Sequence, residues 1–545
     1  MKIQNPVLRG FHPDPSLLRV KDDYYIAVST FEWCPGVRIY HSKDLAHWEY
    51  FCSPVDEIKA DLRGAASSDG IWAPCLSYDD SYFYLIYTLS HGAREFPVMD
   101  MSNYLIRAKN LKGPWSPPVY LNSSGFDPSL FHDEDGKKYL LNMEWDYRED
   151  NGKRAFAGIL LQEYDVQLQC LVGEPRKIFC GTGIGRTEGP HLYKHQGFYY
   201  LICAEGGTGW FHAVTAARSK NPEGPYEKYP GNPVLSSWKG YFDGKGTKEK
   251  NLLEEVRTGL QKAGHASLME TGDGRWYMAH LCARPVEGTK CCPMGRETAL
   301  EEIEWKDGWP VLKAGGHLPQ AFVEIPLEEE TKTWQHEQKE YTFWDEDFLK
   351  DFQTLRIPYK SAGMTIHERA GCLRIYGQES IYSRFCQALL ARRQTELCFR
   401  AGTKFEFHPL SYQHCAGLIY RYDEKNQIYA CVTYEESWKN EAVCLWSVVR
   451  GRMELVFKAP IKAAVYELEV QVNNREARFL YMEQGQKKQM GGPVGILHMS
   501  DDLANGFTGC FVGMCIQDLR SRERYADFHS FWYDAVPDGQ KKSVE

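Results

Sequence analysis

Long apolar segments and long basic blocks are both missing from this 545-residue chain. No run of about eighteen apolar residues exists that could cross a bilayer, and the opening residues MKIQNP lack the basic-then-apolar pattern of an export signal. The formal net charge is −9, without the clustered Lys and Arg that bind phosphate backbones. The sequence therefore argues against a membrane protein and a nucleic-acid-binding protein, and it favours neutral ligands.

Paired cysteines are missing as well. The 17 cysteines are an odd number, are scattered along the chain and include no Cys-x-x-Cys spacing, so neither a disulfide framework nor a metal-binding cysteine motif is indicated. Several of them, among them Cys203, Cys398 and Cys431, lie inside apparent strands. We expect buried free thiols and a cytoplasmic location, where thiols stay reduced.

What the sequence does contain is a short pattern that returns five times in its first three hundred residues. In each copy a Pro or Ala, followed two residues later by Leu, leads through a polar turn into an aromatic strand. Such runs predict β-hairpins, and their spacing of 54 to 76 residues suits four-stranded blades with loops. We predict a five-bladed β-propeller over residues 1–325. The copies span residues 13–30, 71–88, 126–143, 187–204 and 263–280.

The repeats stop before a polar, charge-rich stretch at residues 326–340, which predicts a crossing between two domains. From residue 341 to 545 the chain shows many short runs in which apolar and polar residues alternate. Strict alternation predicts antiparallel sheets with one face in water, as in a sandwich. The predicted fold class is all-β, a five-bladed β-propeller followed by a C-terminal β-sandwich.

Acidic side chains stand at the start of three of the five repeats, one or two residues before the Pro or Ala that marks each repeat. We call these positions the repeat heads. Because the innermost strand of a propeller blade begins beside the central channel, residues at these heads converge on one place. Three carboxylates that face one another raise each other's pKa, which is costly in a structural role. Two carboxyls across a polar pocket, one protonated and one ionised, are the groups that cleave a glycosidic bond, and a third can tune the acid. The heads carry Asp14, Trp72, Phe126, Asp127, Glu188 and His265.

Each of these residue types has a structural alternative. An Asp before Pro is by itself an ordinary turn signal, and the aromatic residues fit propeller core as well as sugar-ring platforms. His265 fits either a satisfied buried histidine or the anchor of a water or cation on the axis. For Arg296 the alternatives are a surface salt bridge and a role in holding substrate or orienting a carboxylate, and we favour the second. Glu205 and Asp69 are expected to bind sugar hydroxyls or to cap turns.

The motifs around these residues resemble those of family 43 glycoside hydrolases, and more narrowly those of the two-domain β-xylosidases of that family. The resemblance covers essentially all of the chain, and the motifs are specific as a set although each alone is weak. They are NPVL at 5–8, PDPS at 13–16, STFEW at 29–33, GIWAP at 70–74, SGFDPSLF at 124–131, TEGPH at 187–191, KAGHAS at 262–267 and GRET at 295–298.

The resemblance implies an inverting enzyme on a five-bladed propeller. It assigns Asp14 as general base, Glu188 as general acid and Asp127 as the carboxylate that tunes and orients the acid. Water attacks the anomeric carbon from the Asp14 side in such a site while Glu188 protonates the leaving oxygen. The two carboxyls are then expected about 6.5–9.5 Å apart, which leaves room for the water.

The resemblance also implies a sugar pocket that a Phe from the second domain closes. Phe507 is the better match for this residue, and Phe511 is the second choice. Closure implies an exo mode, in which a blind pocket releases one sugar at a time from the non-reducing end. The implied substrate-binding residues are Phe31, Trp72, Phe126, His265, Arg296 and Phe507.

The activity implied by the resemblance is that of an exo-acting β-xylosidase on xylobiose and short β-1,4-xylo-oligosaccharides, with an α-L-arabinofuranosidase side activity. A dedicated α-L-arabinofuranosidase is the alternative in the same class, and a non-catalytic sugar-binding propeller is the alternative outside it. No cofactor is required, a divalent cation such as calcium near His265 is left open, and a homo-oligomer, dimer or tetramer, is expected. Residues 91–103 and 240–260 depart from the family pattern, which leaves leaving-group preference and oligomer contacts open.

Overall fold

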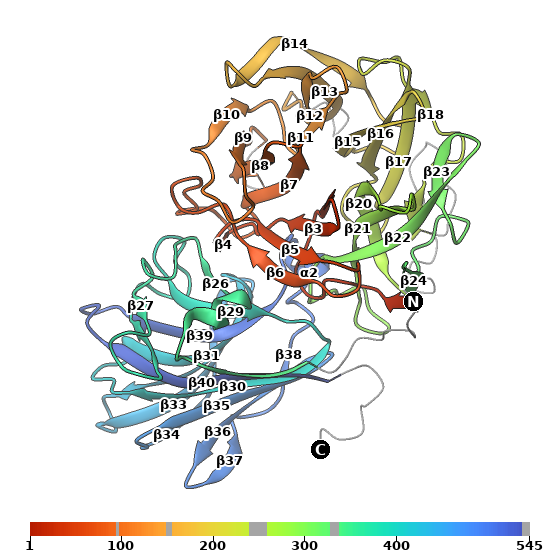
Figure 1. Ribbon diagram of the computed structural model, residues 1–545. Coiled ribbons are helices and arrows are strands. Elements are labelled where there is room, and N and C mark those ends of the chain that lie inside the picture. The colour runs from red at the N-terminus through yellow and green to blue at the C-terminus, as the bar shows by residue number, and fades with distance from the viewer. Residues whose placement is uncertain (94–96, 149–154, 239–258, 327–336, 537–545) are drawn as a thin grey trace.

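The computed structural model describes residues 1–93, 97–148, 155–238, 259–326 and 337–536. Figure 1 shows two bodies, a ring of small sheets built from the N-terminal residues and a pair of larger sheets built from the C-terminal residues. Within the described ranges the regular elements are strands apart from two short helices, η1 (Glu346–Lys350) and α2 (Asp501–Ala504). None of the helices in those ranges is long and apolar enough to span a membrane.

Each of the five predicted repeats forms the inner hairpin of one antiparallel sheet, which confirms the predicted propeller. The inner strands close a ring, since β2 contacts β7 and β20, β11 contacts β7 and β15, and β15 contacts β20. The blades are β2 (Ser16–Val20), β3 (Asp23–Val28), β5 (Arg38–Ser42) and β6 (Glu49–Cys52); β7 (Gly70–Tyr78), β8 (Phe83–His91), β9 (Asp100–Ala108) and β10 (Val119–Asn122); β11 (Ser129–His132), β12 (Lys138–Trp145), β13 (Phe156–Asp165) and β14 (Cys170–Phe179); β15 (Glu188–His195), β16 (Phe198–Glu205), β17 (Ala213–Ser219), β18 (Glu227–Lys228) and β19 (Leu235–Ser236); and β20 (Gln261–Glu270), β21 (Trp276–Ala283), β22 (Glu297–Lys306) and β23 (Trp309–Leu312).

A residue with a left-handed backbone conformation, in which φ is positive, stands at the same place in all five repeats, directly before the Pro or Ala that marks the repeat. The φ angles are 55° at Asp14, 37° at Ala73, 56° at Asp127, 55° at Gly189 and 45° at His265. Only glycine adopts such angles without cost, and other residues keep them where the surrounding structure compensates, often at functional sites. The turn therefore places the residues of each head in an equivalent position at the mouth of the ring.

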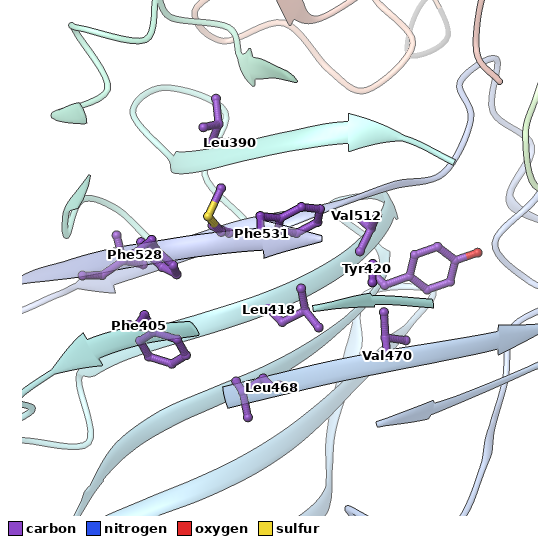
Figure 2. Close-up of a cluster of buried hydrophobic side chains, with 14 of the residues drawn as sticks. Leu390, Phe405, Leu418, Tyr420, Leu468, Val470, Val512, Phe528 and Phe531 are labelled. Atoms are coloured by element: carbon purple, nitrogen blue, oxygen red, sulfur yellow. The ribbon is translucent and has the colours of Figure 1, made fainter. Parts of the chain in front are cut away.

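The C-terminal body is a sandwich of two antiparallel sheets. Side chains from both sheets meet between them, as the labelled residues in Figure 2 show. One sheet has the order β27-β28-β40-β30-β35-β36-β37, with β25 on β40 and β38 on β36, and the other has the order β34-β33-β32-β31-β39-β29-β26-β4. The strands of the first sheet are β25 (Gln338–Thr342), β27 (Met364–Thr365), β28 (Leu373–Tyr376), β30 (Cys398–Phe407), β35 (Tyr466–Asn473), β36 (Glu476–Glu483), β37 (Gln486–Gln489), β38 (Val494–Gly495) and β40 (Tyr525–Val536). Those of the second are β4 (Trp33–Cys34), β26 (Phe352–Leu355), β29 (Ala388–Arg393), β31 (His414–Asp423), β32 (Asn426–Glu435), β33 (Asn440–Val449), β34 (Arg452–Pro460) and β39 (Phe511–Asp518).

The expectation that each sandwich sheet keeps one face in water is wrong for part of the second sheet, although its edge strand β34 is largely exposed. Strand β31 is buried along its whole length, because its outer face packs against the propeller in one shared apolar cluster. Strand β4 comes from the propeller half of the sequence and pairs with β26, with Cα partners Thr354 and Cys34. The Trp33 ring also stacks on Phe511 of β39, with the ring centres 3.7 Å apart. The two bodies therefore share a continuous core.

The ends of the propeller meet at a small sheet, in which β1 (Lys2–Gln4) pairs with β24 (Phe322–Glu324). Strand β25 begins at Gln338, so the last residues of the predicted crossing at 326–340 already belong to the sandwich. Most of that crossing, and the 240–260 segment apart from its last two residues, lie outside the described residues. In the 91–103 segment, β8 ends at His91 and β9 begins at Asp100.

Candidate active site

A cavity of about 470 Å³ opens at the heads of the propeller repeats, within the size range of small-molecule sites. It brings together every residue that the sequence predicts for the site, from both domains. The predicted residues that line it are Asp14, Phe31, Trp72, Phe126, Asp127, Glu188, His265, Arg296 and Phe507.

Asp14 lies buried in this cavity between two hydrogen-bond donors. The Ser29 hydroxyl donates to its Oδ2 at 2.7 Å, and Arg296 Nη1 donates to its Oδ1 at 3.1 Å. Burial alone would raise the pKa of Asp14, but the charge of Arg296 and the hydrogen bond from Ser29 outweigh it and hold the pKa below its usual value. Asp14 is therefore ionised at neutral pH, as a general base must be.

Glu188 is buried without such support. Its Oε1 has no hydrogen-bond partner among the described residues. Burial, and then the negative charge of Asp14, raise its pKa to about 8, against the opposing charges of Arg296 and Arg186. Glu188 therefore keeps its proton at neutral pH and faces the cavity with a group able to donate it.

Asp127 is the third carboxyl, and its pKa is also raised, by burial and by the charges of Glu188 and Asp14. Its Oδ2 accepts the backbone N–H of Gly189 at 3.0 Å, so it contacts the strand start that carries Glu188. The sequence predicted that Asp127 both tunes the pKa of Glu188 and orients its side chain. Burial and Asp14 already raise that pKa, so the contact with Gly189 supports the orienting role better than the tuning role.

His265 lies between the base and the third carboxyl. Its Nδ1 is 3.9 Å from Asp14 Oδ1 and 3.9 Å from Asp127 Oδ2, and burial lowers its pKa, so the ring is neutral at pH 7. Calcium needs six to eight oxygen ligands, but no group of three or more His, Cys, Asp or Glu side chains in the described parts of the chain is placed to hold a metal ion.

Aromatic rings form the walls of the cavity. The Trp72 ring centre lies 5.9 Å from that of Phe31 and 5.6 Å from that of Phe126. The guanidinium of Arg296 lies 5.3 Å from the ring centres of both Phe31 and Phe507. Flat apolar rings with a few polar groups among them suit a sugar, which has apolar ring faces and hydroxyls at its edge.

Phe507 is the residue that the sandwich contributes to this wall. Its backbone N–H donates to the Ser68 hydroxyl at 2.9 Å, and its carbonyl accepts from Arg296 Nη2 at 3.1 Å. Nearby, Asp502 of α2 binds Lys262 Nζ at 2.9 Å and accepts from the indole of Trp210 at 3.0 Å. Phe511, the second choice from the sequence, is fully buried against Trp33 and does not line the cavity.

Several lining residues were not predicted. Trp145 ends β12 and Phe156 begins β13. The second strands of the other blades do not end, and their third strands do not begin, with Phe, Tyr or Trp, so no repeated sequence signal pointed to these two residues. Arg186 lies two residues before Glu188, close enough to favour its ionised form. The lining residues that the sequence did not predict are Ala93, Met99, Met101, Trp145, Ala155, Phe156, Arg186, Gly207, Thr208 and Asn505.

Glu205 and Asp69 cap turns, which was one of the two alternatives for them. Glu205 accepts from the backbone N–H and the hydroxyl of Thr182 at 2.8 and 2.9 Å, and so holds the loop that leads to Glu188. Asp69 accepts the backbone N–H of Gly92 at 2.8 Å. Neither carboxyl lines the cavity.

A proton donor and a proton acceptor that face one sugar-sized cavity are what hydrolysis of a glycosidic bond requires, so the class of protein is a glycosidase. Residues 3–310 match the family model of glycosyl hydrolases family 43, and residues 340–534 match the β-xylosidase C-terminal concanavalin A-like domain. The chain therefore belongs to family 43 of the glycosyl hydrolases, whose members invert the configuration at the anomeric carbon.

Known relatives match the chain over its full length. It is 42% identical to a β-xylosidase of Bacillus subtilis, with 98% of this chain and 99% of the relative covered. It is 41% identical to xylosidase/arabinosidase 43B of Humicola insolens, with 98% of each covered. The crystal structure of xylan β-1,4-xylosidase from Bacillus halodurans C-125 is similar with a TM-score of 0.90 and 45% identity, and covers 98% of this chain and 100% of that one.

Proposed function

We propose that this chain is an exo-acting β-xylosidase that releases xylose from the non-reducing end of xylobiose and short β-1,4-xylo-oligosaccharides. The observation that carries this proposal is the pocket closed by Phe507, in which an ionised Asp14 and a protonated Glu188 face one aromatic-walled cavity. Full-length relatives named β-xylosidase support the choice of sugar.

In the proposed reaction the terminal xylose lies between the aromatic walls with its anomeric carbon facing Asp14. Asp14 accepts a proton from a water molecule as the water attacks that carbon, and Glu188 donates its proton to the departing glycosidic oxygen. The water attacks the face opposite the leaving group, so a β-linkage yields α-xylose. Arg296 keeps Asp14 ionised until the water attacks, and Asp127 orients the strand start that carries the acid.

We propose in addition an α-L-arabinofuranosidase side activity. Relatives support it, since the Humicola insolens protein carries both activities in its name and a 32% identical protein of Bacteroides ovatus is named a non-reducing end α-L-arabinofuranosidase. Comparing kcat/KM on xylobiose and on an aryl arabinofuranoside tests the order of the two activities. Higher efficiency on xylobiose is expected, and the reverse order would make the chain a dedicated arabinofuranosidase.

We also propose that the enzyme requires no cofactor, acts in the cytoplasm and assembles as a homo-oligomer, dimer or tetramer. The cytoplasmic location is supported by the free thiols, of which thirteen of seventeen are buried. An interface between copies is supported by Met453, Leu455 and Val456, which are exposed on the edge strand β34. Light scattering of the purified protein tests the assembly, and a monomer at micromolar concentration would contradict it.

A further inference from the structure

Ser68 stands where two walls of the sugar pocket meet, although its side chain does not line the cavity. It makes three hydrogen bonds with three different segments. Its backbone N–H donates to Glu32 Oε2 at 3.0 Å, its carbonyl accepts from the indole N–H of Trp72 at 2.9 Å, and its hydroxyl accepts the backbone N–H of Phe507 at 2.9 Å. Ser68 is 2% exposed and has a φ of 76°, so the turn that carries it is tightly defined.

Two of these partners are aromatic residues of the pocket that come from different domains. Trp72 begins the second propeller blade on β7, and Phe507 follows α2 of the sandwich. Both rings face the cavity. One residue therefore ties the propeller wall to the wall that the sandwich contributes, across 439 positions of sequence.

The Ser68 turn is itself held from both sides. Glu32, which accepts the Ser68 N–H, is buried, and its backbone carbonyl accepts the N–H of Arg356 in the sandwich at 2.8 Å. The side chain of Arg356 donates from Nε to the carbonyl of Ala65 at 2.6 Å, three residues before Ser68. A shift of the Ser68 turn would therefore have to break contacts between the domains.

We propose that Ser68 is a positioning residue for sugar binding: its hydroxyl and carbonyl together fix Phe507 against Trp72 and so set the affinity of the pocket for a single xylose unit. The inference rests on the proposed β-xylosidase function. It concerns binding more than chemistry, because Ser68 touches neither Asp14, Glu188 nor Asp127 in the hydrogen bonds above.

The test compares Ser68→Ala and Ser68→Gly with Ser67→Ala. Both Ser68 variants remove the acceptor of the Phe507 N–H, and glycine also adopts the positive φ without strain, so it keeps the test open if the alanine variant folds poorly. Ser67→Ala is the matched control, because the Ser67 hydroxyl also reaches the sandwich, but its partner there, Glu424, does not line the pocket.

Xylose binding is measured by calorimetry, and xylobiose hydrolysis by initial rates. Loss of the hydrogen bond to the part-buried N–H of Phe507 predicts that the Kd for xylose and the KM for xylobiose each rise about five- to tenfold in both Ser68 variants. The kcat is expected to stay within about threefold, and Ser67→Ala is expected to change none of these values. If Ser68 acts through Phe507, adding Ser68→Gly to Phe507→Ala produces no further rise.

Unchanged Kd and KM in a folded Ser68→Gly variant would overturn the proposal, as would a loss of kcat at unchanged Kd, or additive effects in the double variant. The same measurements on the wild-type enzyme separate failure of the Ser68 proposal from failure of the proposed function. If the unmodified enzyme neither binds xylose nor cleaves xylobiose, the β-xylosidase assignment fails; if it does both and the Ser68 variants match it, only the role of Ser68 fails.

Discussion

Replacing Glu188 tests the division of labour among the three carboxyls. Glu188→Gln keeps the size of the side chain and removes the proton that the wild-type group donates. With a pKa raised to about 8, about ten molecules hold that proton at pH 7 for each one that has lost it. Its Oε1 has no partner among the described residues, so the substitution breaks few contacts within the protein.

The size of the effect depends on the leaving group. A positioned general acid contributes about 10²- to 10⁴-fold to a rate, which corresponds to about 2.7 to 5.5 kcal/mol of activation free energy. The leaving group of xylobiose is the hydroxyl oxygen of the second xylose, which needs this proton, so kcat/KM is expected to fall by the full factor. An aryl xyloside with a good leaving group needs little protonation, so its kcat/KM is expected to fall less than about tenfold.

The assay is the ratio of kcat/KM values on these two substrates in the wild type and in Glu188→Gln. Glu205→Gln is a matched control, since Glu205 is a buried glutamate that holds the loop before Glu188 but does not line the cavity. Its losses are expected to be the same on both substrates. Equal losses on both substrates in Glu188→Gln would refute the acid role of Glu188.

Three further outcomes are expected. The kcat/KM on xylobiose rises as pH increases through the lowered pKa of Asp14 and falls as pH increases through about 8, where Glu188 loses its proton. Arg186→Gln removes a positive charge that favours ionised Glu188, so the pH at which kcat/KM falls is expected to move upward. A downward shift would contradict this. Phe507→Ala raises the xylose inhibition constant about tenfold by removing a wall of the pocket, and an unchanged constant places Phe507 outside the sugar site. Exhaustive chelation is expected to leave activity unchanged, because Asp14 and Glu188 supply the base and the acid from the protein itself, and a loss restored by added calcium would contradict this.

The propeller and its site were predictable because the same physical requirement recurs five times. Each blade needs a start signal and a turn, and the repeats align these signals so closely that Asp14, Asp127 and Glu188 fall at equivalent heads. Once a closed ring is assumed, those heads must converge. The left-handed turn at each head was not predicted, since Gly189 is the one strong signal among the five, Asp14, Asp127 and His265 are weaker ones, and Ala73 gives none.

Contacts between the domains could not be predicted in the same way. Strand β4 joins a sandwich sheet through a pairing of Cys34 with Thr354, and two residues have no pattern that announces such a distant partner. The alternation in β31 predicts that one face of its sheet is exposed to solvent, as it would be in an isolated sandwich. The propeller covers that face in the two-domain protein. No other repeat has Ser at the position of Ser68, so its contact with Phe507 becomes visible only once both domains are in place.

The central claim is that Asp14 activates water on one side of the sugar while Glu188 protonates the oxygen on the other. Proton NMR during the first minutes of hydrolysis of an aryl β-xyloside tests it most directly, because the only xylose released is the one whose linkage is cleaved, and its anomer is observed before mutarotation. The arrangement predicts that α-xylose appears first from the β-linkage and then equilibrates. Initial release of β-xylose would contradict the mechanism.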